Sequence, residues 1–98
     1  MTDRRMLHHQ IHLNGYPQKM RVEGMIYHVE SKRLGVHPDG PQVIEVWSEG
    51  SLFGPIPPER TFQAFGTGEA LPDDAVYQKS VRAPDGTMWH LFELTGVE

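Results

Sequence analysis

The chain contains no cysteine, and no apolar run approaches the ~18 residues that a membrane-spanning helix needs. The missing cysteines exclude disulfide frameworks, zinc ribbons and cysteine nucleophiles. The segment from Met1 to Leu7 lacks the hydrophobic region of a signal peptide. From these absences we expect a soluble cytoplasmic protein with no membrane partner and no metal or other cofactor.

The chain also lacks an excess of positive charge. Its formal net charge is −4, whereas a domain built for duplex nucleic acid is usually basic, so that partner is disfavoured. Hydrophobic residues make up 38% and charged residues 22% of the 98 positions, which is typical of a folded protein. The length fits one domain over residues 1–98, and we expect residues 1–7 to form a flexible N-terminus.

Helical periodicity is absent as well, because ten glycines and eight prolines divide the chain into short pieces. The pieces alternate apolar and polar residues, which predicts an all-β protein. Six to seven short antiparallel strands fit a curved sheet, a sandwich or a barrel-like roll. We expect residues 25–35 and 42–48 to pair as a hairpin. The predicted strands are 8–13, 17–22, 25–35, 42–48, 61–65, 75–82 and 87–94.

The last predicted strand is apolar on both faces, with Met88, Phe92 and Leu94 on one and Trp89 and Leu91 on the other. Such a strand is usually central in its sheet, or central at an interface between subunits. Because the chain is short and edge strands must be covered, we expect a homo-oligomer. The candidate interface residues are Phe92 and two apolar residues of the Gly- and Pro-rich segment 50–59, Phe53 and Ile56.

The segment Gly66-Thr67-Gly68 is the element most typical of a binding site. Two glycines around a hydroxyl let the main chain approach a ligand, and their N–H groups suit an anion. The segment lacks the lysine of a phosphate-binding P-loop, and a sharp strand exit that needs positive φ explains the glycines equally well. If it is a site, the candidate lining residues are Gly66, Thr67, Gly68, Glu69, Trp89 and His90.

The six histidines do not form a recognisable metal or catalytic motif. His8 and His12 share one strand face and His9 lies on the other, so these three do not make a site. His28 and His90 meet only if their strands are neighbours; Glu30 or Glu93 could then complete a metal or acid–base site. Surface or packing roles are the alternative for all of them.

Two other sets of residues carry side chains that could bind or react. The spacing of Glu69, Asp73 and Asp74 matches no EF-hand, and a solvated loop explains it. Thr67, Ser80 and Ser48 show no nucleophile motif, so the sequence predicts no catalytic residue.

The stretch Arg60-Thr-Phe-Gln-Ala-Phe-Gly-Thr-Gly-Glu-Ala-Leu-Pro-Asp-Asp resembles a small family of proteins of unknown activity that is frequent in tailed bacteriophages and prophages. In that family a Tyr strand and a closing Trp-His-x-Phe-Glu strand follow, as Tyr77 and Trp89–Glu93 do here. The resemblance covers residues 8–94 and implies a phage origin and a β-rich fold. Family members often have His after Gly-Thr-Gly, where this chain has Glu69.

Taken together, these features favour a non-enzymatic phage accessory protein in the host cytoplasm. It would bind a host protein or sequester a small ligand, such as one of nucleotide type, to counteract host defence. One alternative is a small phosphodiesterase-like enzyme that uses His28 or His90. Another alternative is a structural role in the virion or its assembly.

Overall fold

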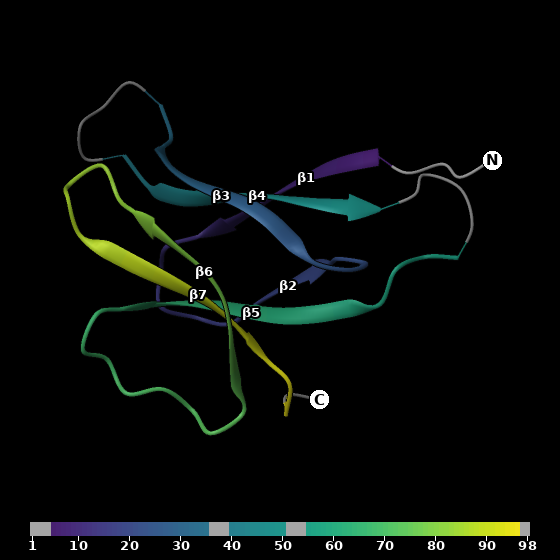
Figure 1. The fold of residues 1–98 in the computed structure, drawn as a ribbon. Coiled ribbons are helices and arrows are strands. Elements are labelled where there is room, and N and C mark those ends of the chain that lie inside the picture. Colours follow the sequence, from purple (N-terminus) through teal and green to yellow (C-terminus); the bar gives the residue numbers. More distant parts are fainter. Residues whose placement is uncertain (1–4, 36–39, 51–54, 97–98) are drawn as a thin grey trace.

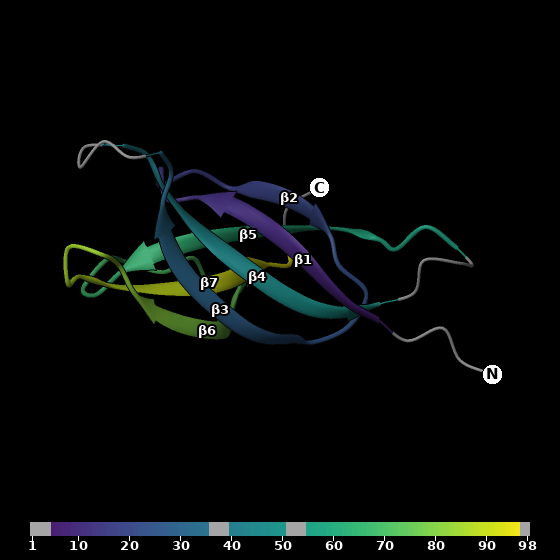
Figure 2. The ribbon, with the colours of Figure 1, turned by 90° about the horizontal axis from the view of Figure 1, so that it is seen from above.

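The computed structural model describes residues 5–35, 40–50 and 55–96, which form seven antiparallel strands in two sheets. The three-stranded sheet A has the order β1-β4-β3, and the four-stranded sheet B has the order β2-β5-β7-β6. Figures 1 and 2 show the two sheets as separate layers that face each other. The strands are β1 (Arg5–His12), β2 (Gln18–Arg21), β3 (Ile26–Arg33), β4 (Gln42–Gly50), β5 (Glu59–Gly66), β6 (Ala75–Arg82) and β7 (Met88–Leu94).

The all-β prediction is therefore confirmed, and of the three architectures it allowed the chain adopts the sandwich, with no closed barrel among the described residues. Every predicted strand is present, and β6 has the predicted bounds of residues 75–82. The hairpin of β3 and β4 is also present. The β7 strand lies between β5 and β6, so the prediction that it is central is confirmed.

Residues 5–7, which we assigned to the N-terminal segment ahead of the first strand, belong to β1. β1 begins at Arg5, because β4 extends to Gly50 and supplies pairing partners for three further residues. Leu7 lies directly opposite Ser48 in the pairing register, and its side chain lies over the main chain of Gly50. A Cβ built on Gly50 would lie 2.5 Å from Leu7 Cδ1, so the glycine makes room for this contact.

The core lies between the two sheets and is built from alternate residues of each strand. Ile44 and Val46 of β4 face Phe62, Ala64 and Leu91 of sheet B in one buried cluster. At about 25 cal/mol per Å² of buried apolar surface, this cluster is the main stabilising contribution to the fold. The other members of the cluster are Ile11, Met20, Val22, Ile26 and Val29, with Leu13, Val81 and Trp89 packed against it.

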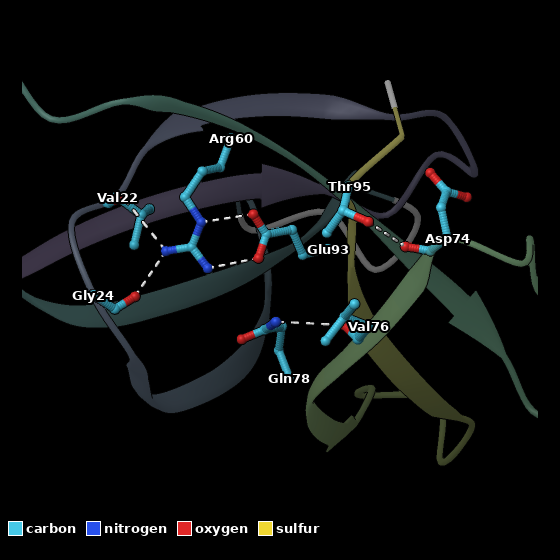
Figure 3. A network of polar contacts seen from close by, with 8 residues as sticks. All are labelled: Val22, Gly24, Arg60, Asp74, Val76, Gln78, Glu93 and Thr95. Carbon is cyan, nitrogen blue, oxygen red and sulfur yellow. Dashed lines mark hydrogen bonds and ion pairs between the residues drawn. The ribbon is translucent and has the colours of Figure 1, made fainter. Parts of the chain in front are cut away.

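Arg60 connects three segments at one end of sheet B (Figure 3). Its guanidinium donates two hydrogen bonds to Glu93, of 2.8 and 2.7 Å, and so joins β5 to β7. A third bond of 2.7 Å runs to the carbonyl of Gly24, and a longer one of 3.4 Å runs to Val22. These hydrogen bonds hold the pKa of Glu93 below its ordinary value and raise that of Arg60.

Candidate functional site

The Gly66–Glu69 segment forms a tight turn where β5 ends. The N–H of Glu69 donates to the carbonyl of Gly66 over 3.2 Å, and Gly68 has a φ of +93°. A side chain at Gly68 would strain this left-handed conformation. The requirement for positive φ therefore holds at Gly68, while Gly66 has no such φ. A Cβ built on Gly68 would meet nothing within 4 Å, so the turn presents open main chain.

His90 connects this turn to β6 through a chain of hydrogen bonds. Its Nε2 lies 2.8 Å from Thr67 Oγ1, and its Nδ1 lies 2.7 Å from Ser80 Oγ. The Tyr77 hydroxyl in turn lies 2.8 Å from Ser80 Oγ. In neutral imidazole one ring nitrogen donates and the other accepts, so a change of tautomer reverses the direction of the chain. The predicted proximity of Thr67 and His90 is therefore present in the structure.

Aromatic rings adjoin this polar chain on the outer face of sheet B. The Phe92 ring makes edge-to-face contacts with Tyr77 and with the buried Phe65, each with centroids 5.6 Å apart. Tyr77 is 56% exposed, so much of its ring is open to a ligand. We refer to Thr67, Tyr77, Ser80, His90 and Phe92 as the His90 face.

The structure does not bring all of the predicted lining residues to this face. Trp89 precedes His90 in β7 and lies on the opposite side of the sheet, packed against the core. Successive side chains of a strand point to opposite faces, so Trp89 and His90 cannot line one surface. The indole of Trp89 donates to Thr87 Oγ1 over 3.1 Å. Glu69 lies at the turn, where its carboxylate folds back over Gly66.

The predicted interface residues also separate. Phe92 belongs to the His90 face, while Ile56 is 77% exposed in the segment between β4 and β5. Phe53 lies outside the described residues. Ile56 is therefore accessible to a partner, and Phe92 is only partly so.

His28 and His90 lie in different sheets, because β3 pairs with β4 while β7 pairs with β5 and β6. His28 Nε2 lies 3.1 Å from Glu30, and its ring packs against Trp47 with centroids 5.3 Å apart. His8 lies opposite Trp47 on the neighbouring strand β1, and the centroids of these two rings are 5.0 Å apart. The condition for a joint site of His28 and His90 is therefore not met. In the part of the chain that the structure describes, no group of three or more His, Asp or Glu side chains is placed to hold a metal.

Two residues of the His90 face, Tyr77 and Ser80, are not among the lining residues predicted from the sequence. They are three residues apart, a spacing that places side chains on opposite faces of a regular strand. The register of β6 against β7 shifts between Tyr77 and Lys79, and this bulge returns Ser80 to the side of Tyr77. A single sequence does not show where the pairing register of two strands shifts, so no local signal pointed to Ser80.

A second histidine contact was also not predicted. His9 Nε2 lies 2.9 Å from the hydroxyl of Ser48, which is fully buried. Burial lowers the pKa of His9, and the neighbouring charge of His8 acts in the same direction. This pair is a core contact between β1 and β4 rather than a site.

The fold and the His90 face define a small two-sheet β-sandwich with a polar and aromatic surface on its four-stranded sheet. The chain belongs to the family described as Domain of unknown function (DUF7352), which it matches over residues 3–98. Neither a curated protein nor a solved structure matches the chain. The described residues contain no helix that is long and apolar enough to cross a membrane.

Proposed function

We propose that the protein is a non-enzymatic binding protein that sequesters a small ligand of nucleotide type on the His90 face. The observation that supports this proposal is the hydrogen-bond chain from Thr67 through His90 and Ser80 to Tyr77, next to the exposed ring of Tyr77. A nucleotide needs an aromatic surface for its base and hydrogen-bonding groups for its polar edges. The His90 face offers both within one surface.

The turn at Gly68 complements this surface. Because nothing lies within 4 Å of a Cβ built there, a ligand can approach the main chain beside Thr67. The hydroxyls and the imidazole of the chain can each donate or accept, so the face can adapt its donors to the ligand. Stacking on Tyr77 is expected to contribute about 1–3 kcal/mol.

The group that contacts His90 Nδ1 is the hydroxyl of Ser80, and this contact favours binding over catalysis. Thr67 Oγ1 lies 2.8 Å from His90 Nε2, which is close enough for a histidine to act as general base toward a hydroxyl. In hydrolases that use such a pair, a carboxylate holds the second ring nitrogen and stabilises the imidazolium. Here the second nitrogen faces the neutral hydroxyl of Ser80. A phosphodiesterase-like activity at His90 is therefore the alternative that the experiment below also tests.

The proposed setting follows from the resemblance to bacteriophage proteins. In that setting the protein is an accessory factor of the host cytoplasm that counteracts host defence, either by removing a nucleotide signal or by binding a host protein. It forms a homo-oligomer. A structural role in the virion is the competing proposal, and detection of the protein in purified particles would support it instead.

The test is a calorimetric titration of the protein with a panel of mononucleotides and cyclic dinucleotides, with product analysis after incubation. The variants are Tyr77→Ala and His90→Ala. The matched controls are Tyr16→Ala and His28→Ala. Tyr16 is 70% exposed and lies outside the His90 face, and His28 lies on sheet A.

We expect stoichiometric binding of at least one nucleotide class and no product. Tyr77→Ala is expected to weaken binding by about 5- to 150-fold, the equivalent of 1–3 kcal/mol, while both controls bind as the wild type does. Binding that survives in Tyr77→Ala and His90→Ala would place the ligand elsewhere. Appearance of product that depends on His90 would replace the proposal with the enzymatic alternative.

A further inference from the structure

The two sheets present four edge strands, and three of them carry features that oppose pairing with another chain. β2 is only four residues long, contains Lys19 and Arg21, and follows Pro17. β3 and β6 each contain a bulge, and the two edges are tied together where Ser31 Oγ donates to the carbonyl of Arg82. Short length, charge and bulges are the usual means by which edges avoid pairing.

The fourth edge, β1, lacks these features. It pairs with β4 over eight consecutive residues without a register shift. Figure 2 shows it at one side of sheet A, next to β4. The residues from Met6 to His12 include no Lys, Arg, Asp or Glu. β1 is therefore a regular edge strand whose fixed charge, Arg5, lies at its first position, and such a strand is a template for a further strand.

The direction of the main-chain groups identifies which residues of β1 are available. The N–H of Leu13 donates to Gln42 over 3.0 Å, so the odd-numbered residues direct their N–H and C=O toward β4. The even-numbered residues therefore direct theirs outward. At His12 the side-chain amide of Gln18 already occupies both groups, accepting from the N–H over 2.7 Å and donating to the C=O over 2.6 Å. Met6, His8 and Gln10 then form the unpaired edge among the described residues.

We propose that a second copy of this chain pairs with β1 through this edge, in the antiparallel sense. His8 lies opposite His8 of the partner subunit, and Met6 and Gln10 lie opposite each other across the same twofold axis. Each such pair exchanges two N–H···O bonds, so the three pairs make about six. The amide of Gln18 blocks extension past His12 and thereby fixes the register.

A second copy fits this edge because its outward positions, residues 6, 8 and 10, are spaced symmetrically about His8, so that one isologous pairing uses all of them in both copies. On the outer face, His28, Trp47 and His8 lie side by side across the three strands of sheet A. In the dimer this row of side chains continues into the equivalent row of the partner subunit. On the inner face, Leu7 and His9 of one copy lie opposite His9 and Leu7 of the other. No fixed like charges meet between residues 6 and 12.

This inference specifies the homo-oligomer included in the proposed function, and its test uses a different strand from the His90 face. The measurement is light scattering after gel filtration over a wide range of protein concentration, for the wild type, His8→Pro and His8→Ala. Among the main-chain donors, proline at position 8 removes one outward N–H and leaves the hydrogen bonds with β4 in place. Edge strands tolerate proline where the N–H points away from the sheet. His8→Ala removes the same side chain but keeps the N–H.

We expect a concentration-dependent dimer for the wild type and for His8→Ala, and a folded monomer for His8→Pro. Gln10→Pro is a second variant with the same expected loss. Hydrogen exchange of the wild type gives a measurement without substitution: the amides of His8 and Gln10 are expected to become protected as the protein concentration rises. A wild type that stays monomeric, or a dimer that persists in both proline variants, would overturn the proposal. Binding of mononucleotides, which occupy a single His90 face, is expected to be unchanged in His8→Pro, so failure of either proposal is visible separately.

Discussion

Replacement of Arg60 by Met tests how much the ion pair at the end of sheet B stabilises the fold. The side chains of Arg60 and Glu93 are 21% and 18% exposed, and the variant leaves the carboxylate of Glu93 without its two hydrogen bonds. Breaking a fully buried pair costs about 3–5 kcal/mol, and partial access of water to Glu93 reduces this to about 2. The lost bond to Gly24 and the lost contact with the Phe62 ring, 5.1 Å from the guanidinium, add about 1.

We therefore expect the free energy of unfolding to fall by about 3 kcal/mol, which corresponds to a decrease in Tm of roughly 12–24 °C for a chain of this length. Urea unfolding followed by tryptophan fluorescence measures the first quantity. Lys19→Met is the matched control, because Lys19 lies 3.6 Å from Glu59 in a pair that is 56% and 45% exposed. Such an exposed pair contributes about 1 kcal/mol or less.

The pH dependence gives a second, independent check. The pKa of Glu93 is lowered in the folded state, chiefly by its hydrogen bonds with Arg60. Its contribution is therefore fully present above the pKa of the unfolded state and is lost as pH falls through the lowered folded value. The difference between wild type and Arg60→Met is expected to shrink over that acid range. A loss no larger than that of Lys19→Met, or a difference that persists in acid, would refute this account of Arg60.

Three further outcomes are expected. The pKa of His9 is lowered from 6.5 by burial, so stability is lost as pH falls below about 6.5, and His9→Gln should remove this part of the pH profile in urea titrations. Gly68→Ala should destabilise by about 1–2 kcal/mol because of its positive φ, whereas Gly66→Ala should stay within about 0.5; equal losses in urea would contradict the turn geometry. Phe62→Ala, at a fully buried position, should cost about 3–5 kcal/mol, and a smaller loss would show that the core can collapse around it.

The strands were predictable because their signals are local. Turn residues before and after residues 75–82 delimited that strand correctly, and the turn dipeptide Asn14-Gly15 marked the end of the first strand. The start of β1 was not predictable, because Arg5 pairs with Gly50, a residue far from it in the chain. The same limit applies to the choice of a sandwich over a barrel. That choice depends on pairings such as β1 with β4 and β5 with β7, which connect segments far apart in the chain.

The candidate site was predictable to the same extent. The Gly-Thr-Gly segment and His90 were identified, and the structure brings Thr67 and His90 together. Ser80 was missed because a bulge in β6 sets its direction, and bulges depend on the register of the partner strand. The prediction that Trp89 lines the site is wrong, because Trp89 packs against the core on the inner face of β7. Strand parity alone separates Trp89 from His90, so this error was avoidable from the sequence.

The two proposals have a joint geometric consequence. The inner row of each sheet forms the core, so the histidine-bearing surfaces lie on the two outer faces, with His8 and His28 on sheet A and His90 on sheet B. The twofold axis passes between the two β1 strands and runs perpendicular to sheet A, so the outer faces of sheet A in both copies point in the same direction. The two His90 faces then lie on one side of the dimer, and the joined His8 row lies on the other. A ligand with two nucleotide groups that spans both faces would bind the dimer more tightly than the monomeric His8→Pro variant, with no additional contact at either face.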